Sequence, residues 1–475
     1  MRTIPRHLIL ILLIGWALLA IRSGDRLTDI REAPHVWIPA AIRNYHLYGD
    51  QIGVMMTRNT APITNPDEII FYSHHPAMMV WVPAVSTALL GFHETGVRFP
   101  FMAITLLTTC LLYVFTRRLF NERVAAWTAF FYLIAPFTNF FGRIAAPDVI
   151  GFLWVMCFAL VIQDWLHKPK RWHLLGLGIF AWLAVWTAWT AVFFIAAFGI
   201  AAMFLGGRHH RIVIVGVGAL TIMAFGALML FYQLQWDGSI NSILDAYVWR
   251  SSTTTFKDEA ATFTALQWIT KNTSEIIVFA TGGIVFLSLA GVLALLRENR
   301  YRQGMILALF AGSLSYQLTF LNASYVHDVD KASFTLVLAL LAGLGHQFWQ
   351  HPKRVRWGRP LTQVAVLAIF IQGVAITLTM HNTGRVPLLN QAIELARAAP
   401  DDVQVAIYLP QIRDDRKSVY AMVAQFYSYR PIIWNKKVEE ARAVVAGQPI
   451  LYINCAQPDS IAATGEAECT TELLN

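Results

Sequence analysis

Long apolar segments separated by short polar turns dominate the first 380 residues of the chain. Each segment approaches the ~20 residues that an α-helix needs to cross a bilayer, so the pattern predicts an all-α polytopic membrane domain over residues 1–380. We count eleven spans. They lie near residues 8–21, 99–116, 124–141, 149–163, 172–187, 189–206, 212–232, 276–296, 304–321, 332–349 and 361–380.

The first apolar segment follows Arg2 and Arg6, as the apolar region of a secretory signal peptide follows its basic region. The residues after it, 21–25, contain no small-x-small cleavage site. We therefore expect an uncleaved signal-anchor that leaves the N-terminus inside.

A further apolar stretch, residues 77–92, decides the topology. If it is a re-entrant or interfacial helix, every basic cluster falls inside, as the positive-inside bias requires; if it crosses, they fall outside. We expect the first arrangement. The basic clusters lie at residues 117–118, 168–171, 208–211, 297–302 and 353–359. The outer face then carries the first loop (22–75), the turns 142–148 and 322–331, the second long loop (233–275) and everything after His381.

Composition supports an integral membrane protein. Of 475 residues, 56% are hydrophobic and 14% charged, whereas about a quarter are charged in a soluble protein. The net charge of +8 comes from juxtamembrane clusters, which argues against nucleic-acid binding. Cys110 and Cys157 lie in apolar spans, whereas Cys455 and Cys469 could pair if their segment faces an oxidising space.

Residues 381–475 change in character, because predicted helices and strands alternate there. This alternation indicates a small soluble α/β domain with parallel strands, outside the membrane. The predicted helices are 388–398, 418–427 and 438–445, and the strands are 403–409, 431–434 and 450–454. Because no Gly-rich phosphate loop occurs here, we expect acceptor docking or stabilisation rather than catalysis.

Ionisable residues gather on the predicted outer face. The first loop contains Asp29, Arg31, Glu32 and His35. Asp148 begins a span, where an unpaired carboxylate is expensive, so it is a candidate functional residue. It could equally serve as a helix N-cap, and both roles can hold together.

Two adjacent histidines, His74 and His75, precede Pro76 and the stretch 77–92. They suit a phosphate clamp better than a metal site, because adjacent side chains point in different directions; a capping or interface role stays open. A further external cluster comes just before a span: His327, Asp328, Asp330 and Lys331. Arg250, in the second long loop, fits a solvated surface better than a site.

Taken in order, these features resemble the membrane glycosyltransferases of the GT-C superfold. The likeness is closest to the bacterial family related to protein O-mannosyltransferases and the lipid A aminoarabinose transferase, glycosyltransferase family 39-like. It covers residues 1–380. The motifs that carry it, after the acidic first loop, are residues 41–50, 72–76, 91–100, 113–120, 143–148 and 327–343. Three features differ. The family's adjacent Asp-Glu pair is replaced by the separated Asp29 and Glu32, a second proline is replaced by Ala77, and the lysine or aspartate that relatives often place in the middle spans is absent from residues 186–189.

The resemblance implies transfer of a sugar from a polyprenyl-phosphate donor to a lipid, polysaccharide or protein acceptor, with inversion at the anomeric carbon. It implies a multi-pass protein of the bacterial cytoplasmic membrane that acts on its outer face. A carboxylate would take the acceptor proton, which is worth ~10²–10⁴-fold. We assign this role to Asp29 first and Glu32 second, and Asp148 would orient the acceptor or a cation.

Cations would stabilise the departing lipid phosphate in a cleft of low dielectric. The candidates for phosphate binding are His74, His75, Arg31 and Lys331. Other candidate site residues are His35, Arg143, His327 and Asp328. No cofactor is certain, and participation of a divalent cation, Mg²⁺ or Mn²⁺, stays open.

Two other classes of protein stay open. A transporter or flippase is marked by ions at mid-span and by broken helices, whereas the ionisable residues of this chain gather at one face. A catalytically inactive relative that acts as an assembly partner fits the missing adjacent Asp-Glu pair.

Overall fold

A computed structural model describes residues 5–27, 35–52, 56–253, 262–350, 357–382, 387–410, 417–445, 448–455 and 469–474. The chain divides into two compact units. The membrane unit comprises Met1–Ser23, Ser73–Gly91 and Thr95–Thr379. The sheet unit comprises Gly24–Tyr72, Phe92–Glu94 and Met380–Asn475.

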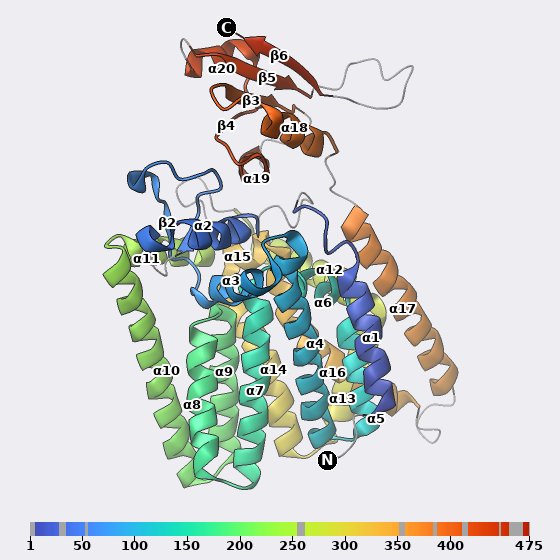
Figure 1. Ribbon diagram of the computed structural model, residues 1–475. Helices are drawn as coiled ribbons and strands as arrows, with labels where there is room; N and C mark the ends of the chain where they lie inside the picture. Colours follow the sequence, from blue (N-terminus) through green and yellow to red (C-terminus); the bar gives the residue numbers. More distant parts are fainter. Residues whose placement is uncertain are drawn as a thin grey trace. The chain divides into compact units, whose positions relative to one another are not determined.

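The membrane unit is built from helices, which confirms the predicted helical class. Figure 1 shows α7, α8, α9, α10 and α14 running alongside one another. Its elements are α1 (Arg6–Ala20), α3 (Met78–Leu90), α4 (Glu94–Leu119), α5 (Glu122–Ile134), α6 (Pro136–Phe141), α7 (Pro147–His167), α8 (Arg171–Val185), α9 (Trp189–Leu205), α10 (Arg208–Gln235), α11 (Ser239–Ser251), α12 (Ala265–Ala280), α13 (Gly282–Leu295), α14 (Arg300–Thr319), α15 (Leu321–Val326), the 3₁₀ helix η3 (Asp328–Ser333), α16 (Phe334–Trp349) and α17 (Gly358–Asn382).

Several helices are long and apolar enough to cross a membrane. Within the described residues there are five, namely α4, α7, α10, η3 with α16, and α17, or six if the bent pair α12–α13 counts as one span. The apolar helices α1, α3, α8 and α9 have 10–17 residues and fall short of this length. The count of eleven spans and the re-entrant or interfacial placement of residues 77–92 therefore stay predictions.

The predicted continuous span 124–141 is wrong, because the chain breaks between α5 and α6. Ala135 is extended, with ψ of 128°, and Pro136 starts α6. Proline disfavours a helical conformation in the residue before it and has no N–H to continue the ladder. The interruption separates α5, of 13 residues, from the buried six-residue helix α6.

The predicted span 276–296 is also interrupted. Thr281 has a φ of 74°, and the axes of α12 and α13 differ by 102° at this break. The Thr281 hydroxyl accepts a hydrogen bond from the Ile284 N–H and so caps α13. Residues 233–275, expected as a loop, contain α11 and much of α12, which begins with a capping box between Thr264 and Gln267.

Glycines allow α13 and α16 to approach closely. A Cβ atom on Gly291 would lie 1.9 Å from the Leu341 carbonyl oxygen, and one on Gly345 would lie 1.9 Å from the Leu287 oxygen. Small residues permit such backbone contact between helices in membranes. This packing anchors α16, which continues directly from η3 and its ionisable residues.

The sheet unit contains a four-stranded sheet in the order β4-β3-β5-β6. Strand β3 pairs in parallel with β4 and β5, with Val405 opposite Ile432 and Leu451, and β6 pairs antiparallel with β5. Its strands are β3 (Gln404–Tyr408), β4 (Ile432–Trp434), β5 (Ile450–Asn454) and β6 (Thr470–Leu474), and the helices around them are α18 (Pro387–Ala398), α19 (Lys417–Ser428) and α20 (Val438–Val444). Strand β6 has no counterpart in the sequence analysis.

The first loop packs with the C-terminal segment in this unit. It contains α2 (Trp37–Ile52), the 3₁₀ helix η2 (Pro66–Glu68), β1 (Met56–Thr57) and β2 (Phe71–Tyr72). The Arg43 guanidinium is buried 4.9 Å from the ring centres of both Phe426 and Tyr429 and donates to the Thr60 carbonyl oxygen at 2.8 Å. The predicted boundary at residue 380 had placed this loop with the helices.

Cys455 and Cys469 form a disulfide that joins the end of β5 to the start of β6. Replacing both by serine removes a cross-link between residues 14 apart, for which we expect a loss of about 3 kcal/mol in unfolding free energy. Urea unfolding of the purified chain, monitored with and without reductant, measures this loss. The Cys110→Ser control has no disulfide to lose; equal stability of both variants and the parent would contradict the prediction.

Candidate functional site

Five ionisable residues from four parts of the membrane unit form what we call the central polar cluster. His74 and His75 lie in the segment before α3, Asp148 in the first turn of α7, Arg250 in the last turn of α11, and Asp330 in η3. The residues are thus separated by as many as 256 positions in the sequence (330 − 74). Their contacts show how the fold brings them together.

Arg250 is the cation of the central polar cluster. Its Nη1 donates to the His74 carbonyl oxygen, and its Nη2 contacts His75 Nε2, each at 3.1 Å. A guanidinium only donates hydrogen bonds, so His75 Nε2 must accept and carries no proton in this arrangement. His75 is therefore neutral here, and the positive charge belongs to Arg250.

The histidine segment is fixed by the helices around it. Trp189 Nε1 donates to the His74 carbonyl oxygen at 2.8 Å, and the Tyr232 hydroxyl donates to that of His75 at 2.6 Å. The His74 side chain contacts Ser242 Oγ at 2.9 Å. Helices α9, α10 and α11 thus hold both imidazoles in defined positions.

Asp148 is the second residue of α7, and only 9% of it is exposed. The N-cap is Ala146, so the N-cap role considered for Asp148 is wrong. Thr190, in the first turn of α9, donates its hydroxyl to Asp148 Oδ1. The charges of Asp330 and Arg250 lie close enough to act on this carboxylate.

Asp330 is a second buried carboxylate in the central polar cluster, with 8% exposed. It hydrogen-bonds to Tyr316, and its carbonyl oxygen accepts from Gln317 Nε2 at 2.6 Å. Its Oδ2 atom has no hydrogen-bond partner within the part of the chain that the structure describes. The sequence analysis had placed Asp330 in an external cluster but not among the candidate site residues.

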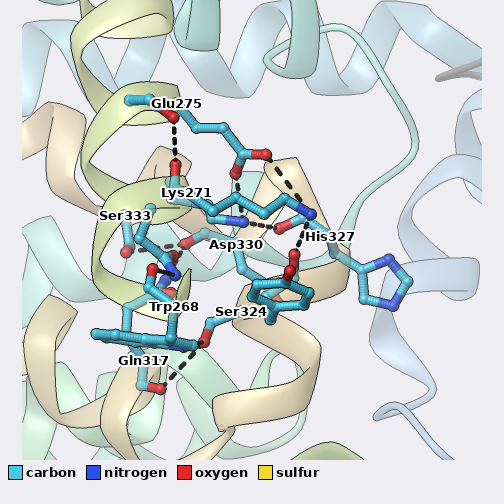
Figure 2. A network of polar contacts seen from close by, with 12 residues as sticks. Trp268, Lys271, Glu275, Gln317, Ser324, His327, Asp330 and Ser333 are labelled. Atoms are coloured by element: carbon cyan, nitrogen blue, oxygen red, sulfur yellow. Dashed lines mark hydrogen bonds and ion pairs between the residues drawn. The ribbon is translucent and has the colours of Figure 1, made fainter. Parts of the chain in front are cut away.

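Lys331 takes part in a polar network with Glu275 and His327. Figure 2 shows this network, which also includes Asp330. Lys331 is fully buried, forms an ion pair with Glu275 Oε2 at 2.6 Å and donates to the His327 carbonyl oxygen at 2.7 Å. Figure 2 shows the His327 ring directed away from this network, so His327 joins it through its backbone. Asp328 is half-buried at the start of η3.

The other predicted site residues lie elsewhere or outside the described residues. Arg143 is buried and donates to the Ile21 carbonyl oxygen. His35 is half-buried in the sheet unit. Three first-loop residues fall outside the described residues: Asp29 and Glu32, the candidate bases, and Arg31, a candidate phosphate ligand.

The sequence analysis had treated Arg250 as a solvated residue, and the structure contradicts this. The side chain is half-buried and hydrogen-bonded to both histidines. Arg250 lies in the last turn of α11, within residues that were expected to form a loop. Its position in the sequence was therefore only a weak signal of a functional role. No group of three or more His, Cys, Asp or Glu side chains arranged for a metal ion occurs among the described residues.

Comparisons with known proteins show which fold this chain shares. Residues 74–236 match the family described as dolichyl-phosphate-mannose-protein mannosyltransferase. The crystal structure of ArnT from Cupriavidus metallidurans bound to undecaprenyl phosphate is similar, with a TM-score of 0.66 and 13% identity over 95% of this chain and 93% of that one. The chain has the GT-C glycosyltransferase fold.

This GT-C fold recurs in a second solved structure. The archaeal oligosaccharyltransferase AglB from Archaeoglobus fulgidus, in complex with an inhibitory peptide and a dolichol-phosphate, has a TM-score of 0.58 and 12% identity over 94% of this chain and 69% of that one. No curated protein sequence matches significantly. The predicted resemblance to GT-C glycosyltransferases is thus confirmed.

Proposed function

We propose that the chain transfers a sugar from a polyprenyl-phosphate donor to a hydroxyl or amine of a lipid, polysaccharide or protein acceptor. The reaction would take place at the outer face of a bacterial cytoplasmic membrane, with the N-terminus inside and residues 381–475 outside. The observation that carries the proposal is the central polar cluster, where Arg250 contacts two histidines and lies within electrostatic range of two buried carboxylates.

Arg250 suits the donor phosphate. Negative charge develops on the phosphate as the sugar leaves, and a fixed cation in a site shielded from water stabilises that charge. Neutral His75 orients Arg250, and His74 lies beside it with its ring held by Ser242. Arg31 is proposed as an additional phosphate ligand, whereas Lys331 already has Glu275 as its partner.

The carboxylates suit the acceptor side of the reaction. Asp148 is held by Thr190, and Asp330 offers the buried Oδ2 atom as an acceptor for a hydroxyl or amine hydrogen. The proton itself would pass to Asp29, with Glu32 as the second candidate. Attack on the anomeric carbon as the C–O bond to phosphate breaks would invert the configuration at that carbon.

The comparisons support the kind of donor. ArnT was solved with undecaprenyl phosphate and AglB with a dolichol-phosphate, both lipid phosphates. A lipid-borne donor needs no nucleotide-binding fold, and the chain's apolar helices suit a membrane substrate. Sugar transfer measured after chelation with EDTA, and again after addition of Mg²⁺ or Mn²⁺, would test whether a divalent cation takes part in the reaction.

Replacing Asp29 by Asn and, separately, Glu32 by Gln tests the proposal in membrane vesicles. We expect Asp29→Asn to lower sugar transfer by about 10²–10⁴-fold, because a positioned general base contributes a factor of this size. Glu32→Gln should have the smaller effect. Transfer of radiolabelled sugar from a synthetic polyprenyl phosphate is the measurement.

The exposed Asp67→Asn, in η2, is the matched control and should transfer at the parental rate. Parental protein that moves the lipid across the vesicle without transferring the sugar would identify a flippase. If the vesicles neither transfer the sugar nor move the lipid, the enzymatic function is refuted, and the assembly partner is the class of protein that remains.

A further inference from the structure

Helix α12 presents a row of polar side chains to the turn that carries Asp330. Trp268, Lys271 and Glu275 are spaced by three and four residues, which places them on one face of the helix. Figure 2 shows all three directed at the segment made by α15 and η3. We call this set of contacts the α12 clamp.

The α12 clamp holds the segment at three successive points. Trp268 Nε1 donates to Ser324 Oγ at 2.8 Å. Lys271 Nζ donates to the Tyr325 carbonyl oxygen and lies 4.5 Å from the centre of the Tyr325 ring. At the third point, Glu275 Oε2 forms an ion pair with Lys331 Nζ at 2.6 Å.

The Glu275–Lys331 ion pair is the inner end of the α12 clamp. Lys331 is fully buried, and the side chain of Glu275 is 19% exposed. Removing Glu275 leaves the buried charge of Lys331 uncompensated, which is far more damaging than removing both partners. Removing Lys331 leaves Glu275 with Lys271, 3.8 Å away, as its remaining cation. The same Lys331 Nζ binds the His327 carbonyl oxygen and so closes the turn 327–331.

Asp330 is adjacent to Lys331 within this closed turn. Its carbonyl oxygen is held from the other side by Gln317 Nε2 at 2.6 Å and by Ser333 Oγ at 3.1 Å. With its backbone held by these bonds, the Asp330 carboxylate lies within electrostatic range of Arg250 and Asp148. The break at Thr281 allows this, because it turns α12 by 102° from the direction of α13.

We propose that Glu275 and Lys331 are positioning residues that fix Asp330 in the central polar cluster through their ion pair. This inference rests on the proposed transferase function. It gives Lys331 a different role from the phosphate ligand expected from sequence, because its ammonium group already binds Glu275 and His327. The two roles predict different kinetics.

Glu275→Gln, Lys331→Met and the double variant test the inference by steady-state sugar transfer with purified, detergent-solubilised full-length protein. We expect each single variant to lower kcat about 10-fold or more while the donor KM changes by less than 2-fold. The double variant should be no worse than the worse single variant, because the two changes act on one interaction. A positioning residue leaves the donor KM unchanged while kcat falls. Loss of a phosphate ligand also weakens binding of the donor, and so raises the donor KM as well as lowering kcat.

Lys436→Met and Glu440→Gln break a matched Lys–Glu pair that is exposed in the sheet unit, and both should behave as the parent. Thermal unfolding of each variant shows whether it is folded. If the single variants unfold but the double variant folds with parental kcat, the pair serves stability alone and the inference is overturned. A raised donor KM for Lys331→Met, or additive losses, would also overturn it. A parental protein without transferase activity would refute the proposed function instead.

Discussion

Arg250→Met should lower kcat for sugar transfer by about 10²–10³-fold, the largest effect that we expect within the central polar cluster. The reason is electrostatic: Arg250 is the cation of the central polar cluster, and removal of a preorganised donor to a developing anion costs this much. The loss should appear with saturating donor in membrane vesicles. Single-turnover measurements would separate the chemical step from product release.

Arg250→Lys separates charge from geometry. An ammonium group is a point charge, and we expect it to lose the paired contacts with the His74 carbonyl oxygen and His75 Nε2. We expect recovery of only part of the activity. The control is Arg208→Met, which removes an exposed arginine from the first turn of α10 and should leave transfer unchanged. Parental kcat in Arg250→Met would remove this residue from the mechanism.

Asp148→Asn should lower kcat/KM by about 10²-fold. The amide keeps the shape and a hydrogen-bond acceptor for Thr190 but removes a buried negative charge that acts on Arg250. A 10²-fold loss corresponds to roughly 2.7 kcal/mol of transition-state stabilisation. Initial rates at varied acceptor concentration measure it, since the proposed role concerns the acceptor.

The matched control lies on the same helix. Asp164, near the other end of α7, forms an exposed ion pair with Arg118 at 2.9 Å, and surface pairs contribute little. Asp164→Asn should therefore transfer sugar at the parental rate. If both aspartate variants lost activity equally, the defect would lie in helix α7 and not in the central polar cluster.

The sequence alone established the class of the protein and the approximate position of most helices. Apolar segments are a local signal, because covering a bilayer demands a run of apolar residues wherever the segment lies. The ordered motifs also led to the GT-C resemblance that the structural comparisons confirm. Asp148 was recognised because an unpaired carboxylate at the start of a span is expensive. His74 and His75 were recognised as an adjacent pair before a proline and an apolar stretch.

Breaks within the apolar segments were harder to predict. Hydropathy sums over a window and passes across Pro136 and Thr281, where the structure interrupts the helices. The bend at Thr281 depends on a backbone conformation that composition does not reveal. It is nevertheless the feature that directs α12 toward η3.

What only the tertiary structure decided is which distant residues meet. Arg250 is indistinguishable in sequence from a solvated arginine, and only its contacts with the histidine segment place it in the central polar cluster. Lys331 and Glu275 are 56 positions apart (331 − 275), and nothing local indicates that they pair. Hydropathy and motif order record the environment of each segment, whereas electrostatic partners depend on distances that arise when the whole chain packs.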